Sequence, residues 1–207
     1  MKSALVLVDL QYDFMPGGAL AVSVGDRVVP VANELSAHFD LVVATQDWHP
    51  RDHGSFASNH AGKKPGDMIE LGGVPQVLWP DHCVQGSPGA ELHRDFDRRR
   101  VKQIFRKGTD REIDSYSGFY DNGHRKATGM GEFLKSEGVT DVYIAGLATD
   151  YCVKFTALDG IRLGFRVHVI EDGCRGVNLS PGDSVRAIEE LRGAGVEILQ
   201  SEILARV

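Results

Sequence analysis

A cysteine at the start of a predicted helix is the residue of this chain best suited to nucleophilic chemistry. The apolar run 142–145 is typical of a buried strand, and Gly146 permits a sharp turn after it. Thr149 or Asp150 is a good N-cap for the helix that follows, so Cys152 falls in its first turn. Free backbone N–H groups and the helix dipole favour a thiolate there, which is the reactive form. The alternative is a small buried cysteine that only packs under the helix.

The order of apolar runs predicts the architecture that must position this cysteine. Helical patterns separate most of these runs, and alternation of strand and helix is typical of a parallel sheet covered on both faces. We therefore expect a three-layer α/β/α fold with a six-stranded, mostly parallel sheet. The predicted strands lie at 4–8, 41–44, 103–105, 142–145, 167–170 and 196–199, and the helices at 26–39, 130–136, 150–163 and 182–193. The interval 46–100 is a long polar loop with no sustained period.

Ionisable residues follow several of these strands, at the edge where open α/β sheets bind ligands. Asp9 follows the first strand, Lys107 follows the third, and the fourth leads to Cys152. A carboxylate can take the proton of the thiol, and an ammonium beside both favours their charged forms. The backbone N–H groups of Ala148 and Cys152 can hold the oxyanion formed from an attacked amide. Taken alone, Asp9 could be a structural cap and Lys107 a surface ion pair.

Two segments of the long loop offer metal ligands. Asp47 and His49 are two residues apart, which puts both side chains on the same side of an extended chain, and His82 comes from a second segment. One aspartate and two histidines suit zinc, iron or manganese with positions left open for water or a ligand. A histidine in a polar loop is also often only solvated or hydrogen-bonded. Further candidates in this loop are Asp52, His53 and His60.

Composition restricts the partners of the protein. The 207 residues suit one domain, 1–207, and the net charge of -6 argues against nucleic acid or an anionic membrane as the main partner. A small molecule fits better. No apolar stretch approaches the roughly 20 residues that span a bilayer. The three cysteines have no disulfide spacing, which indicates a cytoplasmic protein, and we assign Cys83 and Cys174 to the core.

Six motifs, in order along nearly the whole chain, strongly resemble those of the nicotinamidases, also called pyrazinamidases, among the isochorismatase-like cysteine hydrolases. They are Val8-Asp-Leu-Gln-Tyr-Asp-Phe14, Thr45-Gln-Asp-Trp-His-Pro50, Trp79-Pro-Asp-His-Cys83, Arg106-Lys-Gly108, Asp114-Ser-Tyr-Ser-Gly-Phe119 and Gly146-Leu-Ala-Thr-Asp-Tyr-Cys-Val153. The resemblance implies hydrolysis of nicotinamide to nicotinate and ammonia through a cysteine thioester, as a step of NAD salvage. It also implies that pyrazinamide is accepted.

The resemblance assigns roles to residues as well. It implies a catalytic triad of Asp9, Lys107 and Cys152, and a divalent metal, zinc before iron or manganese, on Asp47, His49 and His82 that holds the pyridine nitrogen. It also implies an aromatic pocket of Phe14, Trp79 and Tyr116, and a non-proline cis peptide between Leu147 and Ala148.

One position departs from part of the family. Some members have a further histidine ligand six residues after the first, where this chain has Ser55. We expect water there, held by Ser55, with His53 as the alternative at a different spacing. Members occur as monomers and as larger assemblies, so the resemblance leaves a homo-oligomer open.

Three other functions stay open at this point. A related cysteine amidohydrolase would act on another small amide or carbamoyl substrate. A metallohydrolase would attack with metal-bound hydroxide, with Cys152 as a bystander. A non-catalytic nucleotide-binding module is disfavoured, because no Gly-x-Gly-x-x-Gly follows the first strand.

Overall fold

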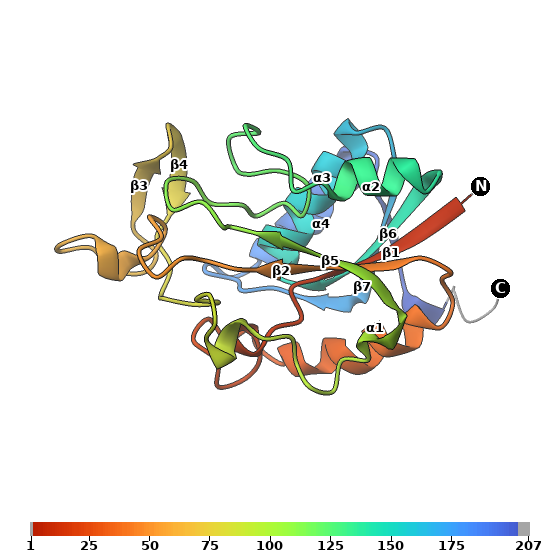
Figure 1. Cartoon of the computed structure of the whole chain (residues 1–207), viewed down its shortest axis with the longest axis horizontal. Helices are drawn as coiled ribbons and strands as arrows, with labels where there is room; N and C mark the ends of the chain where they lie inside the picture. The colour runs from red at the N-terminus through yellow and green to blue at the C-terminus, as the bar shows by residue number, and fades with distance from the viewer. Residues whose placement is uncertain (1, 203–207) are drawn as a thin grey trace.

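A six-stranded sheet forms the centre of the molecule in the computed structural model, which describes residues 2–202 (Figure 1). All five neighbouring pairs of strands are parallel, and the strand order is β5-β2-β1-β6-β7-β8. The strands are β1 (Lys2–Val8), β2 (Val42–Asp47), β5 (Val101–Lys107), β6 (Val139–Leu147), β7 (Arg166–Arg175) and β8 (Glu197–Leu199).

Helices cover both faces of this sheet. Figure 1 shows α1 (Val28–Ser36) on one side and α2 (Met130–Ser136), α3 (Lys154–Arg162) and α4 (Asp183–Gly193) on the other. Successive residues of β1 alternate between the two cores, because side chains along a strand point to opposite faces. Val6 packs in the core under α2–α4, whereas Leu5 and Leu7 pack in the core under α1. The predicted three-layer α/β/α fold is confirmed.

The structure corrects several predicted boundaries. Five of the six strands are longer than their apolar runs, whereas β8 is one residue shorter than the run 196–199. Lys107 ends its strand rather than following it, and Asp47 is the last residue of β2. The predicted helix 26–39 divides into a 3-10 turn at Gly25–Arg27 and α1, and the predicted helix 150–163 begins with a π-helical turn at Thr149–Val153 before α3. Further 3-10 turns lie at Tyr12–Phe14, Ala57–Asn59, Pro88–Ala90 and Arg98–Arg100.

The long loop contains a hairpin that the sequence did not predict. Strands β3 (Met68–Leu71) and β4 (Val74–Val77) pair antiparallel, and Gly72 and Gly73 between them have φ angles of 58° and 77°. Strands of four residues with partly exposed side chains are too short to produce a periodic pattern. The hairpin extends away from the central sheet (Figure 1).

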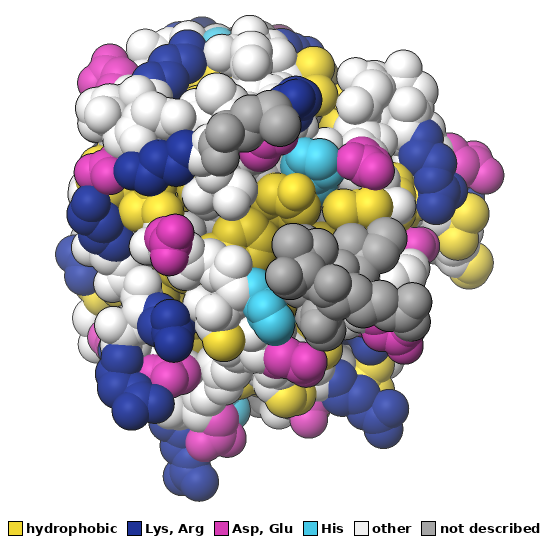
Figure 2. Space-filling model, turned by 90° about the vertical axis from the view of Figure 1, so that its right-hand side faces the viewer, with side chains coloured by type: hydrophobic (Ala, Val, Ile, Leu, Met, Phe, Trp, Pro, Cys, Tyr) yellow, Lys and Arg dark blue, Asp and Glu magenta, His cyan; other side chains and the backbone are white. Residues whose placement is uncertain are grey.

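No helix among residues 2–202 is long and apolar enough to cross a membrane. Figure 2 shows the face at the end where both termini lie, and acidic side chains are dispersed there among the basic ones. The described residues of that face therefore do not form a continuous basic tract of the kind that binds nucleic acid.

Gly146 allows β6 to pass very close to β1. Its φ is 131°, and a Cβ at this position would lie 2.2 Å from the Val8 carbonyl oxygen. Val8 pairs with Gly146 in the sheet and immediately precedes Asp9. Any side chain at position 146 would therefore push apart the two strands that lead to Asp9 and Cys152.

Replacing Gly146 by alanine should lower the free energy of unfolding by about 1–3 kcal/mol, because of overpacking and the positive φ. Urea denaturation of purified variants measures this change. Gly193→Ala is the control: its added Cβ meets nothing within 4 Å, and it lies at the end of α4, so we expect equal or slightly higher stability. Equal stability of the two variants would contradict the close approach.

Candidate active site

The buried ammonium of Lys107 lies at the centre of the candidate site. Its Nζ is 2.9 Å from Asp9 Oδ2, 2.6 Å from Asp47 Oδ1 and 3.4 Å from Cys152 Sγ. It also donates a hydrogen bond of 3.0 Å to the Ser115 carbonyl. Burial alone would lower the pKa of Lys107, but Asp47 and Asp9 outweigh it and raise that pKa well above its ordinary value. Lys107 is therefore a fixed positive charge shared by two carboxylates and a thiol.

The order of strands in the sheet explains why these groups meet. Strands β5, β2, β1 and β6 are neighbours, and their carboxyl ends carry Lys107, Asp47, Asp9 and the turn to Cys152. The structure thus brings Asp9, Lys107 and Cys152 together at the edge where the strand exits predicted them. Thr45 Oγ1 donates a hydrogen bond of 2.6 Å to Asp9 Oδ1, which orients the carboxylate.

The sulfur of Cys152 lies in a buried environment that disfavours its charged form. Cys152 is 6% exposed, and burial raises the pKa of the thiol well above its ordinary value, although Lys107 opposes this shift. Burial therefore opposes the thiolate that the helix terminus favours, because the effect of lost water is larger than that of the nearby positive charge. A carboxylate oxygen of Asp9 lies within 4.8 Å of the sulfur, so a proton acceptor is at hand during attack.

The cap predicted for this helix is wrong. Ala148 occupies the N-cap position, and no side chain caps the turn. The Asp150 carboxylate instead accepts hydrogen bonds of 2.9 Å and 2.7 Å from the backbone N–H groups of Val177 and Asn178. The Asp150 carboxylate thus accepts two hydrogen bonds from the neighbouring loop, instead of the single one that it would accept from its own helix as an N-cap. The peptide between Leu147 and Ala148 is cis, as the resemblance implied.

Asp47, His49 and His82 converge as a metal site requires. One potential ligand atom from each lies within 4.8 Å of the others, and all three residues are buried. His49 Nδ1 lies 2.9 Å from the Gly108 carbonyl and His82 Nδ1 lies 2.8 Å from the Pro80 carbonyl. Each Nδ1 donates to its carbonyl, so Nε2 is the ring nitrogen that faces Asp47 Oδ2, at 3.4 Å for His49 and 3.8 Å for His82.

The remaining loop candidates lie at different distances from this group. His53 is beside it: its ring centroid is 4.3 Å from that of His49, its Nδ1 lies 2.7 Å from Ser55 Oγ, and its buried Nε2 has no hydrogen-bond partner among the described residues. Asp52 is an exposed partner of Arg111, and His60 Nε2 donates to the Gly54 carbonyl. These last two are therefore not part of the site.

A small aromatic pocket lies beside Cys152. Phe14, Trp79 and Tyr116 all line it, and Trp79 Nε1 donates a hydrogen bond of 3.1 Å to the Tyr116 hydroxyl. It is also lined by residues that were predicted for other roles, namely Asp47, His82, Ala148 and Cys152. The remaining walls were not predicted, because side-chain packing leaves no periodic signal. Asp114 and Tyr151 lie within motifs that carry the family resemblance, so those motifs were a signal for them. Leu20 and Val177 lie outside these motifs.

Gln11, which was not predicted as a site residue, is buried and holds the backbone of Asp47 in place. Gln11 Nε2 donates to the Asp47 carbonyl and Gln11 Oε1 accepts from the Asp47 N–H, both at 2.8 Å. The position of Gln11 just after the first strand, next to Asp9, is the signal that could have revealed it.

Comparison with known proteins agrees with this geometry. Residues 3–203 match the Isochorismatase domain family. The chain belongs to this family. A nicotinamidase of Escherichia coli is 50% identical over 199 residues, which cover 94% of this chain and 93% of that protein. These matches confirm the family resemblance found in the motifs.

Solved structures of family members share the fold closely. A nicotinamidase and pyrazinamidase of Acinetobacter baumannii superposes with a TM-score of 0.95 at 47% identity, with 98% of each chain covered. A pyrazinamidase of Pyrococcus horikoshii in complex with zinc gives a TM-score of 0.79 at 40% identity, covering 97% of this chain and 99% of that one.

The pH dependence of catalysis should report the environment of Asp9. Burial raises the pKa of this carboxyl above its ordinary value, against the opposing effect of Lys107. Protonated Asp9 cannot accept the thiol proton, so kcat/KM should fall as the pH is lowered through the pKa of Asp9. This fall should occur at a higher pH than an ordinary carboxyl group would give. A pH profile of kcat/KM measures this limb.

Thr45→Val is the matched variant for this profile. It removes the hydrogen bond that stabilises ionised Asp9 while keeping the shape of the side chain. The acid limb should therefore move up by about 1–2 pH units. A limb that stays in place, or moves to lower pH, would rule out Asp9 as the group that titrates.

Proposed function

We propose that this protein is a nicotinamidase, which hydrolyses nicotinamide to nicotinate and ammonia in NAD salvage and also accepts pyrazinamide. The observation that carries the proposal is the set of contacts made by Lys107. Its ammonium contacts the Cys152 thiol and the Asp9 carboxylate on one side, and the carboxylate of Asp47, a proposed metal ligand, on the other. Similarity to nicotinamidases over nearly the whole chain supports the choice of substrate.

The first half of the proposed reaction acylates Cys152. Its sulfur attacks the carboxamide carbon while Asp9 takes the thiol proton. The backbone N–H groups of Ala148 and Cys152 stabilise the resulting oxyanion. The carbon–nitrogen bond then breaks, and Asp9 returns the proton to the departing ammonia, which leaves a thioester.

The second half releases the acid. Asp9 takes a proton from a water molecule, whose oxygen attacks the thioester carbon. The carbon–sulfur bond breaks, and the proton held by Asp9 returns to the sulfur of Cys152. The acid loses its remaining proton to solvent or to the released ammonia and leaves as nicotinate. Throughout, Lys107 keeps a positive charge beside whichever group is negative, and Phe14, Trp79 and Tyr116 enclose the ring and exclude water.

The donors at Asp47, His49 and His82 fit a divalent cation, with zinc as our first choice and iron or manganese as alternatives. Burial and the charge of His49 lower the pKa of His82 to about 4, so its Nε2 is a neutral donor at neutral pH. When bound, the cation supplies a Lewis acid that holds the pyridine nitrogen. Ser55 Oγ lies 2.7 Å from His53 Nδ1, so both proposed holders of a water molecule, Ser55 and His53, lie together beside the site.

The proposed setting is the cytoplasm, with a small molecule as the main partner. Cys83, Cys152 and Cys174 are all free, as in a reducing compartment.

Ammonia release from nicotinamide tests the proposal. The wild type should be active, and Cys152→Ala should lose about a thousandfold or more of kcat/KM, because the nucleophile is removed. Cys174→Ala is the control, since it deletes another buried thiol that does not line the pocket.

Two outcomes would contradict the proposal. Full activity of Cys152→Ala, together with loss of activity on chelation alone, would favour attack by metal-bound hydroxide. Turnover of a carbamoyl compound without turnover of nicotinamide would move the function to a related amidohydrolase.

A further inference from the structure

The pocket beside Cys152 is too small to hold a ring as it stands. Its volume is about 20 Å³, whereas a cavity that takes up benzene measures about 150 Å³. Cys152 itself is only 6% exposed. A ring-bearing amide therefore reaches the sulfur only after one wall of the pocket moves.

Several walls are held by hydrogen bonds. The Tyr116 hydroxyl accepts from Trp79 Nε1 at 3.1 Å and from Gln76 Nε2 at 2.9 Å, which fixes both aromatic rings. The Val177 N–H donates to the buried Asp150 carboxylate at 2.9 Å. Moving any of these walls would break a bond in a mostly buried environment.

Among residues 2–202, the interactions of the Tyr151 side chain are ring contacts. It is partly exposed and lies edge-on to Trp79 and Tyr116, with ring centroids 4.8 Å and 5.3 Å away. Its hydroxyl finds no hydrogen-bond partner within residues 2–202. Edge-to-face contacts of this kind contribute only about 0.5–1.5 kcal/mol each beyond burial. Phe14 also lines the pocket without a side-chain hydrogen bond, but it is 5% exposed, so moving it would expose more apolar surface. Rotation of the partly exposed Tyr151 ring is therefore the least costly opening among the aromatic walls.

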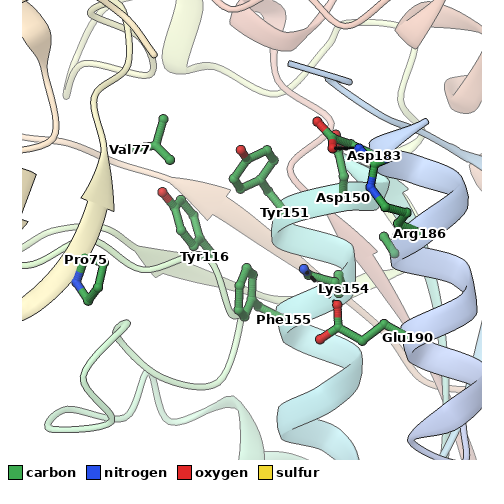
Figure 3. Close-up of a pocket in the computed structure, with 11 residues that line it drawn as sticks. Pro75, Val77, Tyr116, Asp150, Tyr151, Lys154, Phe155, Asp183, Arg186 and Glu190 are labelled. Atoms are coloured by element: carbon green, nitrogen blue, oxygen red, sulfur yellow. Dashed lines mark hydrogen bonds and ion pairs between the residues drawn. The ribbon is translucent and has the colours of Figure 1, made fainter. Parts of the chain in front are cut away.

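A second and larger pocket lies on the outer side of the same ring. Its volume is about 450 Å³, and Tyr116 and Tyr151 line both pockets. Figure 3 shows Tyr116, Tyr151 and Phe155 grouped beside the start of α3, with Pro75 and Val77 of the hairpin facing them. Phe155 stacks on Tyr116, with centroids 5.4 Å apart and planes at 29°. The outer pocket has both the volume and the aromatic surface to hold one ring.

The charges of the outer pocket favour a neutral ligand over an anion. Lys154 pairs with Glu190 at 3.2 Å, and Arg186 pairs with Asp183. With Asp150, the lining carries three carboxylates against two cations, so the surplus is negative. A neutral carboxamide can enter this surrounding, whereas a carboxylate product is repelled from it.

We infer that the outer pocket is a vestibule that binds neutral aromatic amides, and that Tyr151 is the movable wall through which they reach Cys152. The identity of the amide rests on the proposed function, but the route does not. Tyr151 thereby controls which ring sizes reach the sulfur.

Alkylation of Cys152 tests the route without using turnover. The rates with iodoacetamide and with N-phenyl iodoacetamide are measured on the Cys152 peptide by mass spectrometry. The measured quantity is the ratio of the rate with N-phenyl iodoacetamide to the rate with iodoacetamide. Tyr151→Ala should raise this ratio about tenfold, because it removes a wall that we expect to be open about 10% of the time. Tyr151→Phe keeps the ring and should keep the wild-type ratio.

A second variant approaches the vestibule from its other side. The Glu190 side chain is 54% exposed, so Glu190→Trp can fill the outer pocket without disturbing the core. It should lower the rate with N-phenyl iodoacetamide about tenfold, which corresponds to a vestibule left free in about a tenth of the molecules. Glu190→Gln removes the charge without filling the space and should react as the wild type does. This pair keeps the test decisive if Tyr151→Ala does not fold.

The inference is overturned if Leu20→Ala, rather than Tyr151→Ala, raises the ratio, because the ring would then pass over Leu20, another wall of the inner pocket. It is equally overturned if Glu190→Trp leaves the phenyl reagent unaffected. Failure of the protein to release ammonia from nicotinamide would reject the proposed function alone, since alkylation does not depend on it.

Discussion

The ion pairing of one buried lysine is the interaction on which the rest of the site depends. Lys107 ends the edge strand β5, yet its side chain is fully buried and contacts Asp9, Asp47 and Cys152. Removing one partner of a buried ion pair costs about 3–5 kcal/mol, because the other charge is left without compensation. Strands β5, β2 and β1 therefore have to keep their register at their carboxyl ends for the fold and the site alike.

The charges around Lys107 also connect the nucleophile to the metal site. Two carboxylates surround one ammonium, so a thiolate at Cys152 would bring a third negative charge into a buried place. That imbalance agrees with a thiol pKa well above its ordinary value. A divalent cation bound at Asp47, as proposed, would offset this surplus and so would favour the thiolate of Cys152.

The sequence predicted the parts of this site that follow from strand order. Asp9, Lys107 and Cys152 were found because parallel strands end at one edge, a rule that needs only the positions of the apolar runs. Features made by packing were not found. The hairpin Met68–Val77 has strands too short for a periodic signal, and the position of Tyr151 between two pockets depends on side chains from distant segments. The raised pKa of the thiol likewise depends on burial, which a helix-terminus rule does not include.

The central claim is that Cys152, ionised by transfer of its proton to Asp9 beside Lys107, forms a covalent bond to the substrate. Acid quenching during turnover of nicotinamide, followed by mass spectrometry of the Cys152 peptide, measures this directly. The account predicts a nicotinoyl thioester on Cys152 that forms and decays fast enough to account for turnover. Turnover of nicotinamide with no acyl group on Cys152 at any quench time, under conditions that preserve a thioester standard, would contradict it.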